Sequence, residues 1–138
     1  MNKLNISWMS PMRLHILSDD NGTLVPIEFS ELPFEPKRVF YVTNVPKGEE
    51  RGNHAHFKTQ QILVCVQGQI LVKLHNGKKL FKKLLTPNDA IFVDKMIWDS
   101  QVFMTGDDVL LSICSTPYDK SDYIEDMSSF LEARRYFK

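Results

Sequence analysis

Residues 48–68 read GEERGNHAHFKTQQILVCVQG and carry more structural information than any other part of the chain. They place two histidines one residue apart, His54 and His56, shortly before a run rich in Val, Ile and Leu. Alternate side chains of an extended strand point to the same face, so we predict that both imidazoles enter one pocket. Two converging imidazoles are typical of either a metal site or acid–base chemistry near neutral pH.

Short β-like runs separated by turn residues make up most of the remaining sequence. The ranges predicted as strands are 14–17, 24–27, 38–43, 61–66, 69–74, 79–84, 90–93 and 109–114. Asn76-Gly77 predicts a type I′ hairpin turn, because both positions of that turn need positive φ angles. Only the C-terminus has helical spacing, and we predict a helix over about 121–136. This pattern predicts an all-β antiparallel barrel or sandwich.

Composition and charge exclude several classes of function. The chain has 138 residues with no visible linker or repeat, so we expect one domain over 1–138. Its 17 basic and 17 acidic residues balance, which argues against nucleic acid or an anionic membrane as a partner. We find no apolar run of membrane-spanning length and no signal segment. Cys65 and Cys114 lie in apolar runs and are expected to be reduced. A disulfide between them is the alternative. We therefore expect a soluble cytoplasmic protein.

The spacing of residues 48–68 resembles the first signature of the cupins. Four positions match it: Gly48, His54, His56 and Gly68. Gln61 takes the position where the signature has a glutamate, and Asp99 takes the histidine position of the second cupin signature. The resemblance implies a small jelly-roll barrel, in agreement with the strand pattern.

A narrower resemblance covers nearly the whole chain. The Arg51-Gly-x-His-Ala-His block, the Ile97-Trp98 pair and the segment 117–124 are similar to those of the WxcM-like sugar 3,4-ketoisomerases of the cupin class. The resemblance implies that the ketone of dTDP-4-keto-6-deoxy-D-glucose moves from C4 to C3, on the way to 3-amino-3,6-dideoxy sugars of surface glycans. It also implies a homodimer with exchanged N-terminal strands, no metal and no cofactor.

The chemistry of the histidine pair stays open between two interpretations. His54, His56 and Asp99 match the two-histidine, one-carboxylate set of non-haem iron sites, as in a metal-dependent dioxygenase-like cupin. Gln61, however, is a neutral and poor metal ligand, whereas imidazole with a pKa of about 6.5 suits proton transfer between C3 and C4. We therefore favour metal-free acid–base catalysis. Two further hypotheses are a non-catalytic cupin that binds a nucleotide sugar and a sugar 3,5-epimerase.

Three residues are predicted to be catalytic. We expect His56 to act on the carbon atoms and His54 to move protons between oxygens, although the reverse assignment fits nearly as well. Tyr41 matches a tyrosine of the resembled family and would orient an imidazole, bind the keto oxygen or pack in the core. Because Phe40 and Tyr41 are neighbours on a strand, only one of them faces inward.

Five further residues are predicted to bind the substrate: Arg51, Arg38, Gln61, Trp98 and Asp99. Arg51 is assigned to the diphosphate, because guanidinium binds phosphate through paired hydrogen bonds, and Arg38 is a weaker candidate. Trp98 would cover the nucleotide or sugar, or fill the core. Asp99 would orient a histidine or bind a hydroxyl. Gln61 also suits a hydroxyl, but it shares the face of the histidines only if a bulge intervenes. The product configuration at C4, galacto or gluco, stays open.

Overall fold

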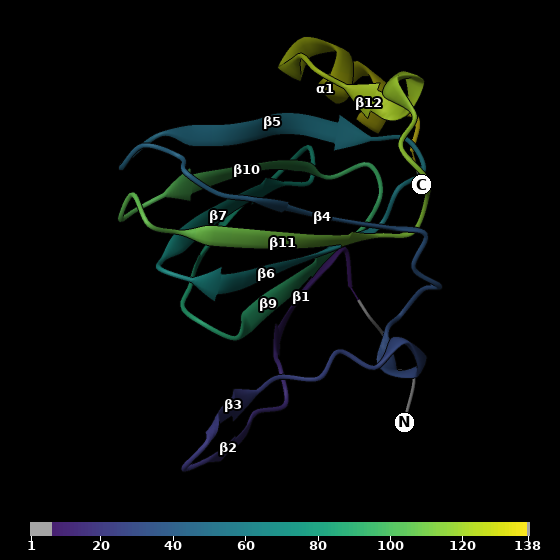
Figure 1. Cartoon of the computed structure of the whole chain (residues 1–138). Coiled ribbons are helices and arrows are strands. Elements are labelled where there is room, and N and C mark those ends of the chain that lie inside the picture. Colours follow the sequence, from purple (N-terminus) through teal and green to yellow (C-terminus); the bar gives the residue numbers. More distant parts are fainter. Residues whose placement is uncertain (1–6, 138) are drawn as a thin grey trace.

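The computed structural model of the chain describes residues 7–137. Within this range the strands form two five-stranded antiparallel sheets and a separate hairpin (Figure 1). The first sheet has the order β1 (Met9–Arg13), β9 (Asp89–Val93), β6 (Gln61–Gln67), β11 (Val109–Cys114), β4 (Arg38–Val42). The second has the order β12 (Tyr123–Ile124), β5 (Glu50–His56), β10 (Trp98–Phe103), β7 (Ile70–His75), β8 (Leu80–Leu85). The all-β jelly-roll prediction is confirmed.

The core lies between the two sheets, because each strand sends every second side chain inward. Its largest fully buried members come from β6, β7, β8, β9 and β10 and include Leu63, Ile70, Leu85, Ile91 and Phe103. Burying one such side chain contributes about 1.5–3 kcal/mol. The cluster therefore stabilises the sandwich strongly enough to hold a group of polar side chains between the same two sheets.

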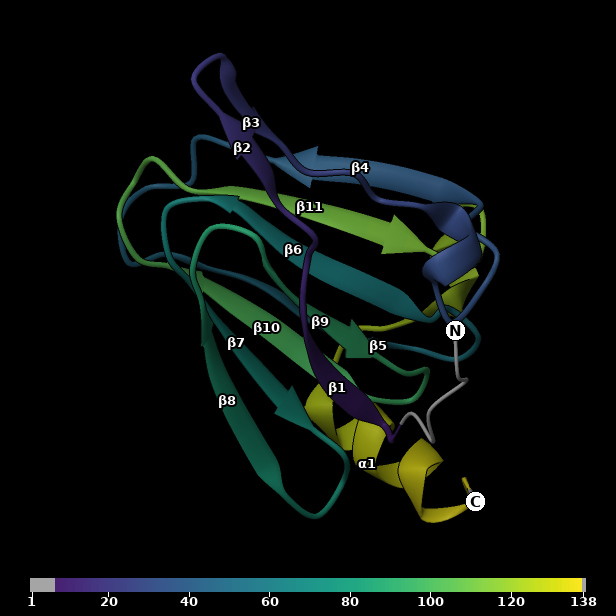
Figure 2. The same cartoon turned by 90° about the horizontal axis from the view of Figure 1, so that it is seen from below.

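A second apolar cluster covers the outer face of the first sheet. Ile62, Val64, Phe92 and Ile113 point away from the core and pack against the chain between β1 and β4. This connection contains β2 (Leu17–Asp19), β3 (Gly22–Leu24) and a 3-10 turn at Phe29–Glu31. Figure 2, seen from below, shows it running along the first sheet, with the β2–β3 hairpin projecting from the body of the molecule. The outward residues of this sheet are thus partly shielded by the N-terminal third of the chain.

The C-terminal helix is shorter than predicted. The range 121–136 begins inside a 3-10 turn (Lys120–Asp122) and continues through strand β12 to α1, which spans Met127–Arg135. The Asp126 side chain caps α1 by accepting from the backbone N–H of Ser129 at 2.7 Å. Tyr123, which falls within the predicted helix, lies in β12 instead. No helix within residues 7–137 has the length and apolar character needed to cross a membrane.

Several strand boundaries also differ from the predictions. The hairpin between β7 and β8 is confirmed, but the predicted type I′ turn is wrong: His75 pairs with Leu80 around a four-residue loop, and Gly77 but not Asn76 has a positive φ. The predicted strands 14–17 and 24–27 are replaced by β2 and β3, which flank the turn at 20–21. Strand β10 escaped prediction because its inward positions, Asp99 and Gln101, are polar although both are buried. A strand that lines a polar cavity lacks the usual alternation of apolar and polar residues.

Candidate active site

A β-bulge in β5 brings two predicted site residues to the same face. His54 lies opposite Asp99 on β10, and Arg51 lies opposite Gln101. Three steps along β5 therefore match two along β10, and Asn53 is the extra residue. In a regular strand, residues three apart face opposite sides. The bulge instead turns Arg51 toward the same side as His54.

Gly52 makes this bulge sterically feasible. Its φ is +90°, and Asn53 follows with a φ of +60°, both in the left-handed region. A Cβ atom at Gly52 would lie 3.0 Å from the carbonyl oxygen of Asp99. Any side chain at this position would push β5 and β10 apart.

Three aromatic rings lie against one another at the end of β5. The ring centroids of His54 and His56 are 5.0 Å apart, which agrees with the prediction that both face one side. The ring of Tyr123 lies 4.4 Å from that of His56 and 5.0 Å from that of His54. The His54 side chain is 24% exposed, whereas His56 is only 3% exposed. Sequence reasoning did not select Tyr123, because only the pairing of β12 with β5 places it opposite His56.

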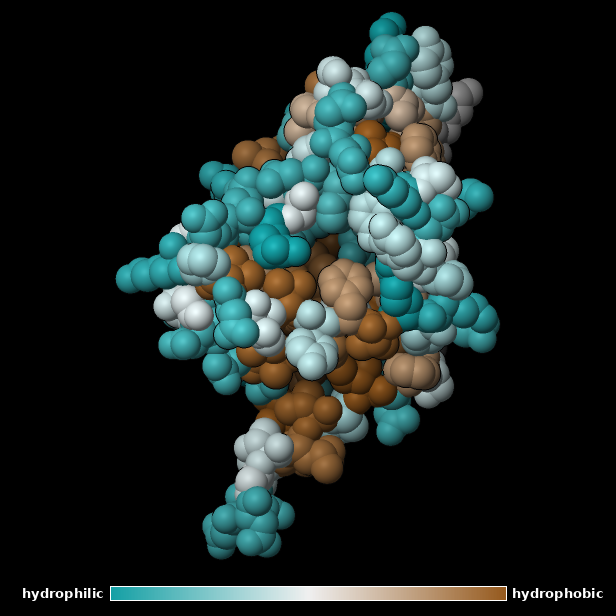
Figure 3. Space-filling model, turned by 45° about the horizontal axis from the view of Figure 1, so that its top comes forward, coloured by the Kyte–Doolittle hydropathy of each residue, from teal (hydrophilic) through white to brown (hydrophobic). Residues whose placement is uncertain are grey.

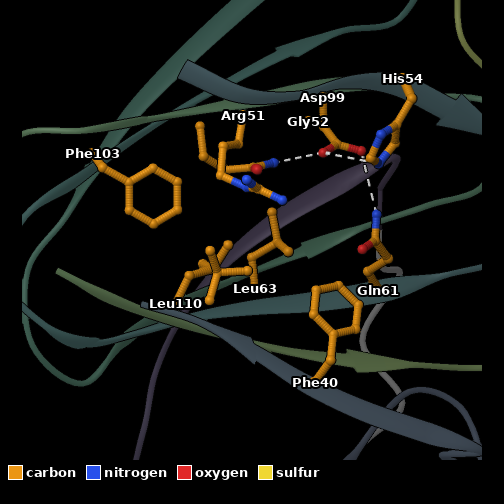
Figure 4. A pocket seen from close by; sticks show the side chains of 11 residues that line it. Phe40, Arg51, Gly52, His54, Gln61, Leu63, Asp99, Phe103 and Leu110 are labelled. Atoms are coloured by element: carbon orange, nitrogen blue, oxygen red, sulfur yellow. Dashed lines mark hydrogen bonds and ion pairs between the residues drawn. The ribbon is translucent and has the colours of Figure 1, made fainter. Parts of the chain in front are cut away.

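A cavity of about 90 Å³ lies between the two sheets beside these rings (Figure 4). Its polar lining comprises Arg51, His54, Gln61, Asp99 and Gln101. Its apolar lining comprises Phe40, Val42, Leu63, Phe103 and Leu110. Figure 3, with the top of Figure 1 turned forward, shows apolar side chains bordering a hollow, with hydrophilic residues above it. The polar wall of the cavity can thus form hydrogen bonds with a ligand, and the apolar wall excludes water.

The carboxylate of Asp99 is the centre of the polar wall. It is 1% exposed and accepts hydrogen bonds from the amide nitrogens of Gln101, at 2.6 Å, and Gln61, at 3.3 Å. The Nε2 atom of His54 lies 4.0 Å from Oδ1 of Asp99. Burial raises the pKa of Asp99, while His54 and the two amides act against that shift. Asp99 therefore points into the cavity and faces His54.

Gln61 connects this wall to the first sheet. Its Nε2 atom lies 3.3 Å from Asp99 and 3.5 Å from Nδ1 of His56, and its Oε1 accepts from the hydroxyl of Ser112 at 3.1 Å. The expectation that Gln61 needs a bulge to meet the histidines is wrong, because β6 and β5 belong to opposing sheets whose inner faces meet. Since the amide is fully engaged, Gln61 has little hydrogen-bonding capacity left for a sugar hydroxyl.

His56 is held in its neutral form. Burial lowers its pKa from 6.5 to about 4, and repulsion by His54 and Arg38 acts in the same direction, against an opposing attraction from Asp122. Within residues 7–137, two buried side-chain nitrogens have no hydrogen-bond partner, His56 Nε2 and Arg38 Nε. Unpartnered polar atoms are costly in a core and are expected where a ligand binds.

Comparison with known proteins now places the chain in a family. The family model named FdtA, described as WxcM-like, C-terminal, matches residues 8–135. The chain belongs to the WxcM-like family. A curated relative is the TDP-4-oxo-6-deoxy-alpha-D-glucose-3,4-oxoisomerase of Aneurinibacillus thermoaerophilus. It is 35% identical over 114 residues, which cover 81% of this chain and 82% of the relative.

Solved structures of similar proteins agree over almost the full length of the WxcM-like chain. The sugar 3,4-ketoisomerase QdtA of Thermoanaerobacterium thermosaccharolyticum, in complex with TDP, superposes with a TM-score of 0.88 at 30% identity, covering 95% of this chain and 98% of QdtA. A histidine-to-asparagine variant of QdtA, in complex with TDP-4-keto-6-deoxyglucose, gives the same TM-score and coverage at 28% identity. A 3,4-ketoisomerase from Helicobacter canadensis has a TM-score of 0.88 at 27% identity, covering 92% of this chain and 97% of that enzyme.

Four predicted site residues of this WxcM-like protein are absent from the cavity lining: His56, which lies against His54 behind it, Arg38, Tyr41 and Trp98. Tyr41 is 70% exposed, and its neighbours Phe40 and Val42 line the cavity instead. Trp98 points to the outer face of β10, where its ring lies 5.8 Å from that of Phe130 on α1. Both corrections follow from strand alternation, because each residue adjoins one that faces inward. The structure thus contradicts a place for Tyr41 and Trp98 in this cavity.

Arg38 lies behind the cavity wall, beside the aromatic rings. Burial acts to lower its pKa, but the nearby Cys114 thiol and Tyr123 phenol outweigh burial and raise it. Its guanidinium carbon lies 5.6 Å from the ring centroid of Phe40 and 5.5 Å from that of Tyr118. Arg38 is therefore a charged neighbour of the rings, held by aromatic contacts.

The polar cluster does not fit a divalent cation well. His54, His56 and Asp99 offer ligand atoms within 4.8 Å of one another. The amide nitrogen of Gln61, however, lies 3.3 Å from Asp99 and 3.5 Å from His56. An N–H donor in that place repels a cation and occupies the Asp99 carboxylate that would bind it.

Proposed function

We propose that this chain is a TDP-sugar 3,4-ketoisomerase that moves the ketone of TDP-4-keto-6-deoxyglucose from C4 to C3. The observation that carries the proposal is the contact of His54, His56 and Tyr123 beside a water-excluding cavity. The same fold, at a TM-score of 0.88, holds TDP-4-keto-6-deoxyglucose in a related ketoisomerase. The paired imidazoles, and the keto sugar that the related enzyme binds, both support a reaction that moves protons on the sugar ring.

The reaction requires proton transfers but no net change of oxidation state. A base removes the proton from C3, and the electron pair forms a C3–C4 double bond while charge moves to the oxygen at C4. A proton is then added to C4. The oxygen at C4 gains a proton, and the hydroxyl at C3 loses one and becomes the ketone. Positioned imidazoles suit each of these steps near neutral pH.

The environments of the two histidines support different roles. His56 is neutral because of its burial, and its unpartnered Nε2 atom is the nitrogen that we assign to accept the proton from C3, in the tautomer that carries its hydrogen on Nδ1. His54 lines the cavity and faces Asp99 at 4.0 Å, and we assign it the transfer of protons between the oxygens. The Tyr123 phenol adjoins both rings and supplies a further hydrogen-bond donor to the developing charge.

Arg51 is proposed to bind the diphosphate. A cavity of about 90 Å³ is small beside the roughly 300–1,000 Å³ of typical ligand pockets, so only the reacting part of the sugar fits inside it. The nucleotide then lies toward the surface, where the exposed Arg51 borders the cavity. Binding energy gained there positions C3 and C4 against the histidines.

We further propose that the chain forms a homodimer through its N-terminal segment and acts in the cytoplasm. In this chain β1 pairs with its own β9, and the β2–β3 hairpin projects outward (Figure 1). Leu17 and Leu24 on that hairpin are 51% and 59% exposed, and Phe29 is 58% exposed. Exposed apolar side chains on a projecting arm favour contact with a second copy or exchange of strands. A mass measured by light scattering at the size of one chain would contradict this.

Turnover of TDP-4-keto-6-deoxyglucose, followed by proton NMR, tests the proposed function. We expect the wild-type protein to form the 3-keto isomer. His56→Asn should keep TDP affinity and lose turnover, and the exposed His15→Asn serves as the matched control. Binding of the sugar nucleotide without isomer formation by the wild type would instead identify a non-catalytic binding protein.

A further inference from the structure

We propose that Ser112 is a positioning residue. Acting through the amide of Gln61, it holds a hydrogen-bond donor between His56 and Asp99, in the space these groups would otherwise close around a cation. The catalytic part of this inference rests on the proposed function, whereas the exclusion of a cation does not.

The hydroxyl of Ser112 and the carboxylate of Asp99 together fix the direction of the Gln61 amide. Ser112 is fully buried on the inner face of β11, and its Oγ atom donates to Oε1 of Gln61 at 3.1 Å. A side-chain amide has one acceptor end and one donor end. Once Ser112 binds the oxygen, the NH₂ group must point the other way, toward the second sheet.

The carboxylate on that side requires a donor. The Asp99 carboxylate lies 3.3 Å from Nε2 of Gln61, and the Nδ1 atom of His56 lies 3.5 Å from it. A reversed amide would set its oxygen against the carboxylate oxygen of Asp99, with no donor between them. Gln61 therefore links a serine of the first sheet to the carboxylate that faces His54 on the second.

This linkage determines how the cluster behaves. The amide keeps Asp99 and His56 apart by the width of one NH₂ group and supplies a neutral donor where a metal would supply charge. Gln61→Glu replaces that NH₂ group by a carboxylate oxygen, which adds a fourth ligand to His54, His56 and Asp99. Such a set of nitrogen and oxygen ligands suits Mn²⁺ or Ni²⁺.

Metal binding tests the inference without reference to turnover. Wild-type protein and Gln61→Glu are stripped with chelator and titrated with NiCl₂ or MnCl₂ by calorimetry. We expect Gln61→Glu to bind at least about 10-fold more tightly than the wild type, since changes around a metal site alter affinity by about 10–100-fold. Equal affinities in the two proteins would overturn the inference, whether or not either protein isomerises the sugar.

Kinetics of Ser112→Ala test the catalytic part. We expect kcat to fall about 10-fold while KM stays nearly unchanged, because the substrate contacts remain and the supporting hydrogen bond is lost. Ser112→Thr should restore kcat, because it restores the hydroxyl. Ser100→Ala is the control: Ser100 is also buried and is next to Asp99 in the sequence, but it has no hydrogen bond to Gln61. An unchanged kcat in a folded Ser112→Ala would overturn the positioning role. If Ser112→Ala does not fold, Ser112→Cys, which keeps nearly the same volume and has only a weak donor, is measured in its place, and an unchanged kcat would again overturn the positioning role.

Discussion

Acidification should destabilise the folded chain through His56. Its ring is 3% exposed, and burial, together with repulsion by His54 and Arg38, lowers its pKa from 6.5 to about 4. Between these two pH values the unfolded chain binds a proton that the folded chain does not, so stability falls as the pH falls through this window. One pKa unit corresponds to about 1.4 kcal/mol, so the contribution of His56 lost by pH 4 is about 3 kcal/mol.

Urea unfolding measured from pH 7 to pH 4, with tryptophan fluorescence as the signal, tests this reasoning. His56→Gln lacks the titrating ring and should lose about 3 kcal/mol less of its unfolding free energy over this range. The lowered pKa values of Asp89 and Asp108 also make stability depend on pH, but both aspartates are present in each protein and their effects cancel in the difference. Identical pH dependence in the two proteins would show that the buried neutral imidazole is the wrong description.

Three further substitutions separate binding, chemistry and stability. Arg51→Ala should raise the Kd for TDP by about 10–100-fold with a smaller change in kcat, because a charge-assisted hydrogen bond contributes about 1.5–3 kcal/mol; unchanged TDP affinity by calorimetry would remove Arg51 from the diphosphate site. Tyr123→Phe keeps the ring contacts with both histidines and removes the hydroxyl, so kcat should fall while the melting temperature stays constant; an unchanged kcat would exclude the phenol from proton transfer. Phe130→Ala should cost about 3–5 kcal/mol of unfolding free energy, because this side chain of α1 is completely buried. A loss below about 1 kcal/mol in urea unfolding would contradict the packing described.

The parts of the site that follow from strand alternation could be predicted from the sequence. His54 and His56 are two residues apart and face one side, as expected. Alternation also limited Phe40 and Tyr41 to one inward residue, but it could not say which one, because that depends on how β4 is placed against β11. The resemblance favoured Tyr41, and the structure places Phe40 at the cavity.

The remaining parts depend on contacts between distant segments. Arg51 joins the face of His54 only because Asn53 bulges, which becomes visible in the register with β10. Tyr123 reaches His56 only because the segment after the 3-10 turn pairs with β5 as a short strand. Ser112 gains its importance from Gln61, 51 residues away in the sequence. Such long-range pairings leave no periodic pattern in a single sequence.

Isomerisation in deuterium oxide tests the central claim most directly. TDP-4-keto-6-deoxyglucose is incubated with chelator-treated protein, and NMR follows the sugar carbons. We predict the 3-keto isomer with deuterium at C4, together with deuterium at C3 of recovered substrate, because the imidazole exchanges its proton with solvent between removal and delivery. Unlabelled, unconverted substrate whose turnover begins only after a divalent cation is added would contradict metal-free proton transfer by the histidine pair.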